Sequence, residues 1–189
     1  MGKPVLIIIS GHPATGKTTF GKMISEELKI PLVSPDGIKE ILWDNIGWKH
    51  DFTEWSNVGK VSFELMYYFI ETCLAQGKSL VAEAHFHPEI NNARLNALKD
   101  KYGCKLLQVH CKADKSVIEE RFRQRMASDN FHPGHRHGIV EVYGEEKFYD
   151  KLGKGEKLLN IDGEVYEVDT TNAENIDSNK VLEFIKSNL

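Results

Sequence analysis

The sequence has few cysteines and no hydrophobic run long enough to cross a bilayer. Three cysteines are an odd number and form no CxxC pair, which argues against a disulfide framework or a zinc ribbon and favours a reducing compartment. The longest purely apolar run, residues 5–9, has the length of a strand, whereas a membrane span needs about 20 apolar residues. That run is also too short for an export signal. We therefore expect a cytoplasmic protein without a membrane partner.

The sequence also lacks an excess of positive charge. Its 24 Lys and Arg residues against 28 Asp and Glu residues give a net charge of −4, so nucleic acid binding would need a local basic patch. The composition therefore favours a small ligand. A length of 189 residues fits one domain with a substantial core. We expect Cys73, Cys104 and Cys111 to be small buried apolar residues of that core.

Apolar runs of strand length alternate with segments of helical period along the chain. The expected strands are 5–10, 31–34, 79–84, 105–111 and 165–169. The expected helices are 17–28, 36–45, 55–76, 88–101, 115–126 and 177–187. Several strand segments are apolar throughout, as expected when helices cover both faces of a sheet. The alternation predicts an α/β fold with a five-stranded parallel sheet.

Two segments carry more specific structural predictions. Apolar residues at three-to-four spacing predict the buried face of the helix over 55–76, namely Val58, Val61, Leu65, Phe69 and Cys73. Residues 127–155 are rich in His, Gly and charge, with few residues to bury. We expect a surface lid or loop around 126–155, holding a short helix near 140–152.

The segment after the first expected strand matches the phosphate-binding pattern GxxxxGK[ST]. It consists of Gly11, His12, Pro13, Ala14, Thr15, Gly16, Lys17 and Thr18. It follows an apolar strand and opens a helix, which is the context that the motif requires. An ordinary glycine-containing turn has no need of Lys and Thr directly after the second glycine. A dinucleotide site would show GxGxxG, which the segment lacks.

The chemistry of phosphate explains this spacing. Glycines at both ends allow the backbone to curl so that its N–H groups point at phosphate oxygens, and the helix that begins near Lys17 aims its positive end at them. We expect Lys17 to reach the β and γ phosphates of ATP, the Thr18 hydroxyl to ligate Mg²⁺, and Thr19 to assist at the α-phosphate. ATP and Mg²⁺ are therefore the expected cofactors.

Two carboxylates lie at the ends of strand candidates. Asp36 follows the second strand at the carboxyl edge of the sheet, where ligands of open α/β folds bind. It is placed to accept a proton from an attacking hydroxyl or to position that hydroxyl, and the alternative is a plain helix N-cap. Glu83 ends the third strand, where a carboxylate can face a bound metal. Its alternative is a solvated strand end.

Arg121 and Arg125 are four residues apart on an expected helix, hence on one face, directly before the lid candidate. Guanidinium groups there would clamp the nucleotide or neutralise charge in the transition state. The alternative is a solvated face that pairs with Glu119 and Glu120. We expect a catalytic role for Arg125 and a surface position for Arg123, which points elsewhere.

Two side-chain clusters leave alternatives open. His132, His135 and His137 lack a Cys or a regularly spaced partner that would complete a tetrahedral metal site, so a solvated loop is favoured over a metal. Contact with phosphate or acceptor, shared by Arg136, is the alternative. Four aromatic residues either belong to the core or line a pocket for an acceptor with an apolar or planar part. They are Trp43, Trp48, Phe52 and Trp55.

With these residues placed, the chain from residue 5 to about residue 172 resembles the small P-loop kinases related to bacteriophage polynucleotide kinase and chloramphenicol phosphotransferase, within the wider nucleoside-kinase-like group. Asp36 followed by Lys39 is similar to the family's Asp followed by a basic residue. The resemblance implies a general-base role for Asp36 and a substrate-side contact for Lys39. The phage enzyme has a paired Asp and an Arg at these places, and this difference disfavours a polynucleotide acceptor.

Three further segments carry the resemblance. Glu83 followed by Ala84, His85 and Phe86 resembles the acidic residue that closes the third strand, and Arg121 with Arg125 looks like the family's pair of lid arginines. Residues 168–171 resemble the segment that borders the adenine, which implies a nucleotide contact for Thr170. The resemblance also implies the strand order 2-3-1-4-5 and ATP as the phosphate donor.

Together these features predict a P-loop NTPase fold with a mobile lid, and transfer of the γ-phosphate of ATP to a hydroxyl. Lys17, Asp36 and Arg125 are the expected catalytic residues. The acceptor is a small molecule, a nucleoside or a nucleic acid 5′-hydroxyl, with the small molecule favoured. An alternative is a nucleotide-binding switch or ATPase that acts through a partner, which needs an ordered water and a partner surface. A nucleic acid binder with a degenerate site is a third alternative.

Overall fold

A sheet of five parallel strands forms the centre of the molecule. The computed structural model describes residues 2–48, 55–154, 157–172, 174 and 176–189. The strand order is β2-β3-β1-β4-β5, which confirms the predicted α/β class and strand order. The strands are β1 (Val5–Ser10), β2 (Leu32–Val33), β3 (Leu80–Glu83), β4 (Lys105–Lys112) and β5 (Glu164–Asp169).

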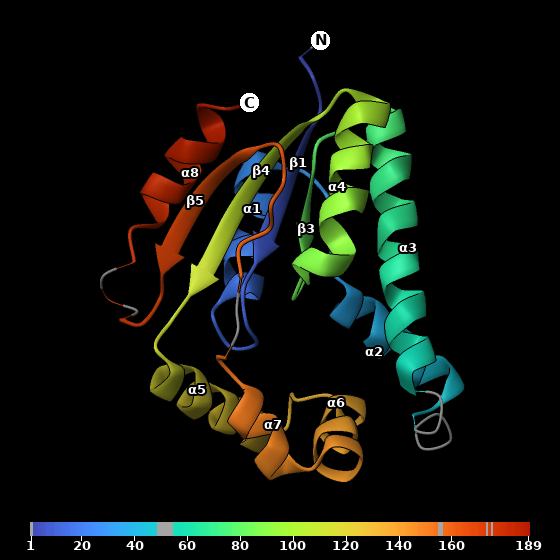
Figure 1. Ribbon diagram of the computed structural model, residues 1–189, viewed down its shortest axis with the longest axis vertical. Coiled ribbons are helices and arrows are strands. Elements are labelled where there is room, and N and C mark those ends of the chain that lie inside the picture. Colours follow the sequence, from blue (N-terminus) through green and yellow to red (C-terminus); the bar gives the residue numbers. More distant parts are fainter. Residues whose placement is uncertain (1, 49–54, 155–156, 173, 175) are drawn as a thin grey trace.

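Helices cover both faces of this sheet. On one face lie α1 (Lys17–Leu28) and α8 (Ser178–Lys186), and on the other lie α3 (Trp55–Ala75) and α4 (Pro88–Tyr102), as Figure 1 shows. Every residue of β1 is buried, with alternate side chains packed into the two layers. Burial on both faces explains why the sequence of this strand is apolar throughout.

The buried face of α3 differs from the predicted one. Among the predicted residues Val61, Leu65 and Phe69 are 39–44% exposed. The buried row follows a spacing of four and consists of Val58, Ser62, Met66, Ile70 and Leu74. The hydroxyl of Ser62 donates to the carbonyl of Gly59 at 2.7 Å, so this polar residue can be buried with its hydrogen bond made. The prediction was right for Val58, and Cys73 is half-buried against the core. Two neighbouring rows of α3 are apolar, and for Val61, Leu65 and Phe69 the sequence pattern selected the exposed one.

Helices gather at the carboxyl ends of the strands, opposite to the two chain termini (Figure 1). They are α2 (Pro35–Ile46), α5 (Lys115–Ala127), α6 (Pro133–His137), the π-helix η1 (Gly138–Tyr143) and α7 (Glu145–Lys151). Residues 127–155 were expected to hold one short helix with few residues to bury. The described part of this segment, residues 127–154, instead forms three short helical elements over a small core, which consists of Ile118, Phe122, Phe131, Ile139 and Leu152.

The cysteines are free thiols, with Cys104 and Cys111 buried and Cys73 half-buried. In the part of the chain that the structure describes, no helix combines the length and the apolar character that a membrane span requires.

Candidate active site

The phosphate loop connects β1 to α1 at the point where the strand order reverses. The strands on either side of β1 are β3 and β4, and this switch point is where open α/β sheets bind their ligands. Gly11 has φ +141°, and a Cβ there would overlap the carbonyl oxygen of Cys111. Ala14 and Gly16 also have positive φ, at 64° and 88°. The loop therefore has the curled backbone that the motif predicted.

Lys17 and Thr18 occupy the start of α1. The buried Lys17 side chain reaches back across the loop, and its Nζ donates to the carbonyl of His12 at 2.6 Å. Thr18 Oγ1 donates to Glu83 Oε2 at 3.3 Å. The hydroxyl of Thr15 is buried under the loop and donates to the same His12 carbonyl at 2.7 Å. An ammonium group at a helix N-terminus inside a curled loop makes a phosphate site.

Glu83 lies at the carboxyl end of β3, buried beside the loop. Burial raises the pKa of its carboxyl group, against the opposing effect of Lys17. Its carboxylate and the Thr18 hydroxyl are hard oxygen ligands side by side, as Mg²⁺ prefers. Among the described residues no three His, Cys, Asp or Glu side chains gather as a metal site. A nucleotide-bound Mg²⁺ needs only one or two carboxylates besides phosphates, so these residues fit that ion.

Asp36 lies in the first turn of α2 and is not the cap of this helix. The cap of α2 is Ser34, whose Oγ accepts from the N–H of Gly37 at 3.2 Å, so the N-cap alternative for Asp36 is wrong. Lys39 Nζ lies 2.7 Å from Asp36 Oδ1. The Asp36 side chain is 53% exposed, yet it lies close to other groups of the site, and its partial desolvation opposes the charge. Lys39, His135 and Lys17 outweigh that effect and lower the pKa of Asp36 to about 2. The side chain is therefore a carboxylate at neutral pH.

Arg121 connects α5 to the segment after β5. Its Nη2 donates to the carbonyl of Thr170 at 2.6 Å, and Thr170 Oγ1 donates to the carbonyl of Thr15 at 3.0 Å. Arg121 therefore does not pair with the glutamates of its own helix. Arg125 places its guanidinium 5.3 Å from the ring centroid of Phe131. Arg123 pairs with Glu119 at 3.8 Å, on the surface as expected.

Two cavities meet at this edge of the sheet. The P-loop cavity has a volume of about 770 Å³. It brings together these predicted site residues: Pro13, Ala14, Gly16, Lys17, Thr18, Thr19, Asp36, Glu83, Arg121, Arg125 and Thr170. The α7 cavity has a volume of about 660 Å³ and lies between the loop and helices α5, η1 and α7. Residues that line both cavities are Pro13, Asp36, Lys39, His85, His87 and Arg125.

Some predicted residues lie elsewhere, and others were missed. His12 lines the α7 cavity rather than the P-loop cavity. Gly11 and Thr15 line neither of these two cavities. Gly11 provides a positive φ of the loop, and the Thr15 hydroxyl donates to the carbonyl of His12. Four residues that line the α7 cavity were not predicted from the sequence, namely Tyr143, Lys147, Lys151 and Lys154. The spacing of four between Lys147 and Lys151 could have signalled a shared helical face.

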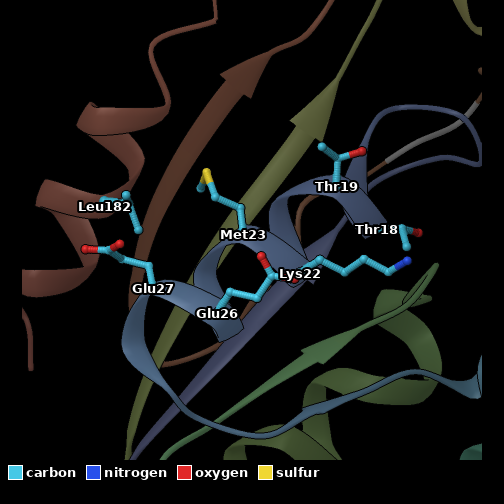
Figure 2. Close-up of a pocket in the computed structure, with 7 residues that line it drawn as sticks. All are labelled: Thr18, Thr19, Lys22, Met23, Glu26, Glu27 and Leu182. Atoms are coloured by element: carbon cyan, nitrogen blue, oxygen red, sulfur yellow. The ribbon is translucent and has the colours of Figure 1, made fainter.

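A further groove runs along the outer side of α1, with a volume of about 570 Å³. Figure 2 shows its side chains between the loop and Leu182 of α8. Thr18 and Thr19 lie at the end of the groove near the loop, and Glu26 and Glu27 line the rest of the groove. The groove has two carboxylates and one cationic side chain, Lys22, so its charge does not favour the binding of an anion. The loop therefore remains the candidate phosphate site.

The histidines of α6 are packed rather than solvated, which corrects the expected loop. Nε2 of His132 lies 3.2 Å from Asp44 Oδ1, and Nε2 of His135 lies 3.2 Å from Glu40 Oε1. Their side chains are only 12% and 11% exposed. Both rings pack on Trp43, with centroids 5.4 and 4.8 Å away. These contacts hold α6 against α2.

Trp43 is fully buried, so the core alternative holds for this residue. Trp48 packs on His132 with ring centroids 5.6 Å apart. Phe52 and the side chain of Trp55 lie outside the described residues. Arg136 does not reach a phosphate site, because its Nη2 donates to the carbonyl of Met126 at 2.6 Å, at the end of α5.

The contact between α6 and Trp43 predicts a large effect of one methyl group. A Cβ at Gly134 would lie 2.5 Å from Cε3 of Trp43, and a buried indole ring cannot move aside freely. We expect Gly134→Ala to lower the free energy of unfolding by about 1–3 kcal/mol, measured by urea denaturation. The control is Gly59→Ala in α3, where a Cβ meets nothing within 4 Å and should stabilise by about 0.5–1 kcal/mol. Equal stability of the two variants would contradict the contact.

Comparison with known proteins agrees with the fold. The crystal structure of a candidate kinase from Chloroflexus aurantiacus j-10-fl is similar, with a TM-score of 0.88 and 31% sequence identity over 100% of both chains. A sugar kinase from Janibacter sp. HTCC2649 has a TM-score of 0.57 at 13% identity, over 97% of this chain and 93% of its own. Shikimate kinase from Bacteroides thetaiotaomicron has a TM-score of 0.53 at 14% identity, over 96% and 98%. The last two likenesses show a shared fold.

A search among curated proteins finds no match. The AAA domain family matches residues 6–137, more than half of the chain, and this span contains the phosphate loop, Asp36, Glu83, Arg121 and Arg125. The chain therefore belongs to the AAA domain family.

Proposed function

We propose that this protein is an ATP-dependent phosphotransferase that moves the γ-phosphate of ATP to the hydroxyl of an acceptor. The observation that carries the proposal is the pair of cavities that share Asp36 and Arg125. One contains the phosphate loop, and the other offers a separate space of about 660 Å³ for a second substrate. A nucleotide switch or simple ATPase has no need of that second space, because its nucleophile is water.

The chain's own residues would act by positioning and by charge. Lys17 and the loop N–H groups hold the triphosphate, and Asp36 accepts a hydrogen bond from the acceptor hydroxyl. The acceptor oxygen forms a bond to phosphorus as the bond to the leaving ADP oxygen breaks, and the hydroxyl proton passes to Asp36 and then to water. Because the pKa of Asp36 is about 2, its main work is orientation, with proton acceptance late in the transfer. Arg125 offsets the negative charge on the transferred group.

Thr18 and Glu83 would hold Mg²⁺, which neutralises charge on the β and γ phosphates when bound. We expect Glu83→Gln to raise the Mg²⁺ concentration for half-maximal activity by about 10–100-fold, because an oxygen ligand with full charge is lost. The measurement is a magnesium titration of initial rates at fixed ATP. Glu167→Gln is the control, since this strand carboxylate is half-exposed and pairs with Lys112. An unchanged requirement in Glu83→Gln would remove Glu83 from the metal site.

The proposal extends to the lid and to the class of kinase. The helices over 133–151, with their flanks, would act as a lid around 126–155 within one domain of 189 residues. Asp36 with Lys39, and Arg121 with Arg125, support a place among the small P-loop kinases that resemble phage polynucleotide kinase and chloramphenicol phosphotransferase. Lys39 in place of Arg favours a small acceptor over nucleic acid. A cytoplasmic setting with millimolar-range ATP would suit this activity.

Incubation with ATP labelled at the γ-phosphate, Mg²⁺ and a mixed metabolite extract tests the proposal. A labelled organic product that requires the extract supports a phosphotransferase. Release of labelled free phosphate alone, at a rate that the extract does not change, would favour the nucleotide switch and contradict the proposal.

A further inference from the structure

The α7 cavity has an unusual balance of charge. Its lining includes one carboxylate, Asp36, and five cationic side chains, which are Lys39, Arg125, Lys147, Lys151 and Lys154. The chain as a whole has a net charge of −4, so this excess of positive charge is local. Lys39 already pairs with this carboxylate at 2.7 Å, and Lys154 pairs with Asp150 at 2.6 Å. The lining cations that form no ion pair with a described carboxylate are Arg125, Lys147 and Lys151. Like charges gathered around one space repel one another, and an anionic ligand would relieve that repulsion.

Helix α7 separates its charges between two sides. Lys147 and Lys151 are four residues apart and both line the cavity. The same helix carries Glu145, Glu146 and Asp150, and none of these three described carboxylates lines it. Lys147 forms no ion pair with any residue that the structure describes. Lys147 and Lys151 therefore line the cavity. The carboxylates of α7 are not part of its lining, although Asp150 pairs with the lining residue Lys154 at 2.6 Å.

The other side chains that line the cavity indicate where the uncharged part of an anionic ligand would pack. Phe122, Phe131 and Phe148 give the cavity an apolar wall. His12 is 6% exposed, and its Nε2 has no hydrogen-bond partner among the described residues. Burial and the charge of Lys17 lower the pKa of His12. Burial, together with the neighbouring His12, His87 and Lys17, lowers the pKa of His85 to about 3. These two rings are neutral at pH 7, so the positive charge comes from the lysines and Arg125.

We infer that the acceptor is a small hydroxyl compound with an anionic group, a carboxylate or a phosphate ester, which Lys147 and Lys151 bind. The inference rests on the proposed phosphotransfer and names the substrate class of the same site. The acceptor hydroxyl lies at Asp36, where the two cavities meet, and the anionic group lies toward α7. The apolar part of the acceptor packs against the phenylalanine wall.

Calorimetry with small anions tests the inference without knowledge of the natural acceptor. The phosphate loop is first filled with Mg²⁺ and a non-hydrolysable ATP analogue, and inorganic phosphate or acetate is then titrated. We expect saturable binding of at least one anion by the wild type, and a loss of at least about tenfold in affinity in the double variant Lys147→Ala, Lys151→Ala. Tighter phosphate indicates a phosphate ester, and tighter acetate indicates a carboxylate.

The matched control is the double variant Lys180→Ala, Lys186→Ala on α8, which removes two exposed helix lysines that pair with Asp177 and Glu27. It should bind anions as the wild type does. Three results would overturn the inference: no saturable anion binding by the nucleotide-loaded wild type, equal affinity in the α7 variant, or an α7 variant that loses affinity only for the ATP analogue. Binding of a 5′-hydroxyl oligonucleotide in place of both small anions would also overturn it. Failure of the analogue itself to bind would instead remove the proposed function.

Discussion

Lys17→Ala is expected to lower kcat/KM for ATP by about 10²–10³-fold or more, because no other side chain of the loop carries a positive charge to the phosphates. The Lys17 ammonium group is buried and donates to the carbonyl of His12 at 2.6 Å, across the mouth of the loop. A bound triphosphate would take over this donor. Initial rates at varied ATP, with circular dichroism to verify the fold, measure the effect.

Lys22→Ala is the matched control for this variant. Lys22 belongs to the same helix and lines the groove on its outer side, and it is not part of the lining of the P-loop cavity. We expect near wild-type rates for this variant. Full activity of Lys17→Ala, or an equal loss in both variants, would contradict the assigned phosphate site.

Asp36→Asn is expected to lower kcat by about 10²–10⁴-fold while the KM for ATP stays the same. The amide keeps the size of the side chain but lacks the negative charge that orients the acceptor hydroxyl and accepts its proton late in the transfer. It also loses the ion pair with Lys39 at 2.7 Å. Asp44→Asn on the same helix is the control, because Asp44 is exposed and contacts His132 away from the cavities. A raised KM for ATP with unchanged kcat in Asp36→Asn would assign Asp36 to nucleotide binding instead.

The pH profile of the wild type gives a second check on Asp36. A carboxyl group with its pKa lowered to about 2 is fully ionised above about pH 4. Its ionisation therefore contributes no acid limb to kcat/KM between about pH 5 and 8. An acid limb in this range that disappears in Asp36→Asn would show that the cationic neighbours do not hold Asp36 ionised.

The sheet and the phosphate loop were predictable because their sequence signals are strong. Strands buried on both faces, such as β1, are apolar at every position, and the loop places Gly, Lys and Thr in fixed order. The order of the strands came from resemblance rather than from the residues. The carboxylates at Asp36 and Glu83 were predictable from their places after strands, because parallel strands bring such positions to one edge.

The expected buried face of α3 and the expected surface loop over 127–155 were wrong for physical reasons. On α3 two adjacent rows are apolar, and the buried one contains Ser62, whose hydroxyl bonds to its own helix, so hydrophobicity alone did not identify it. The segment over 127–155 has few apolar residues, but Phe131, Ile139 and Leu152 meet Ile118 and Phe122 of α5 in space. Only tertiary contact makes that core.

The lysines of the α7 cavity were missed for a related reason. On a seven-residue helix that also carries three carboxylates, the charges look like an ordinary solvated surface. Their separation into two sides depends on how α7 faces the loop, which sequence spacing does not reveal.

Calorimetric titration of the folded protein with MgATP tests the central claim most directly. If the curled loop, the Lys17 ammonium group and the Thr18 hydroxyl form a triphosphate site, one nucleotide should bind per chain with measurable heat, and Lys17→Ala should bind far more weakly. A well-folded wild type that shows no heat of association with MgATP or MgGTP would contradict the claim.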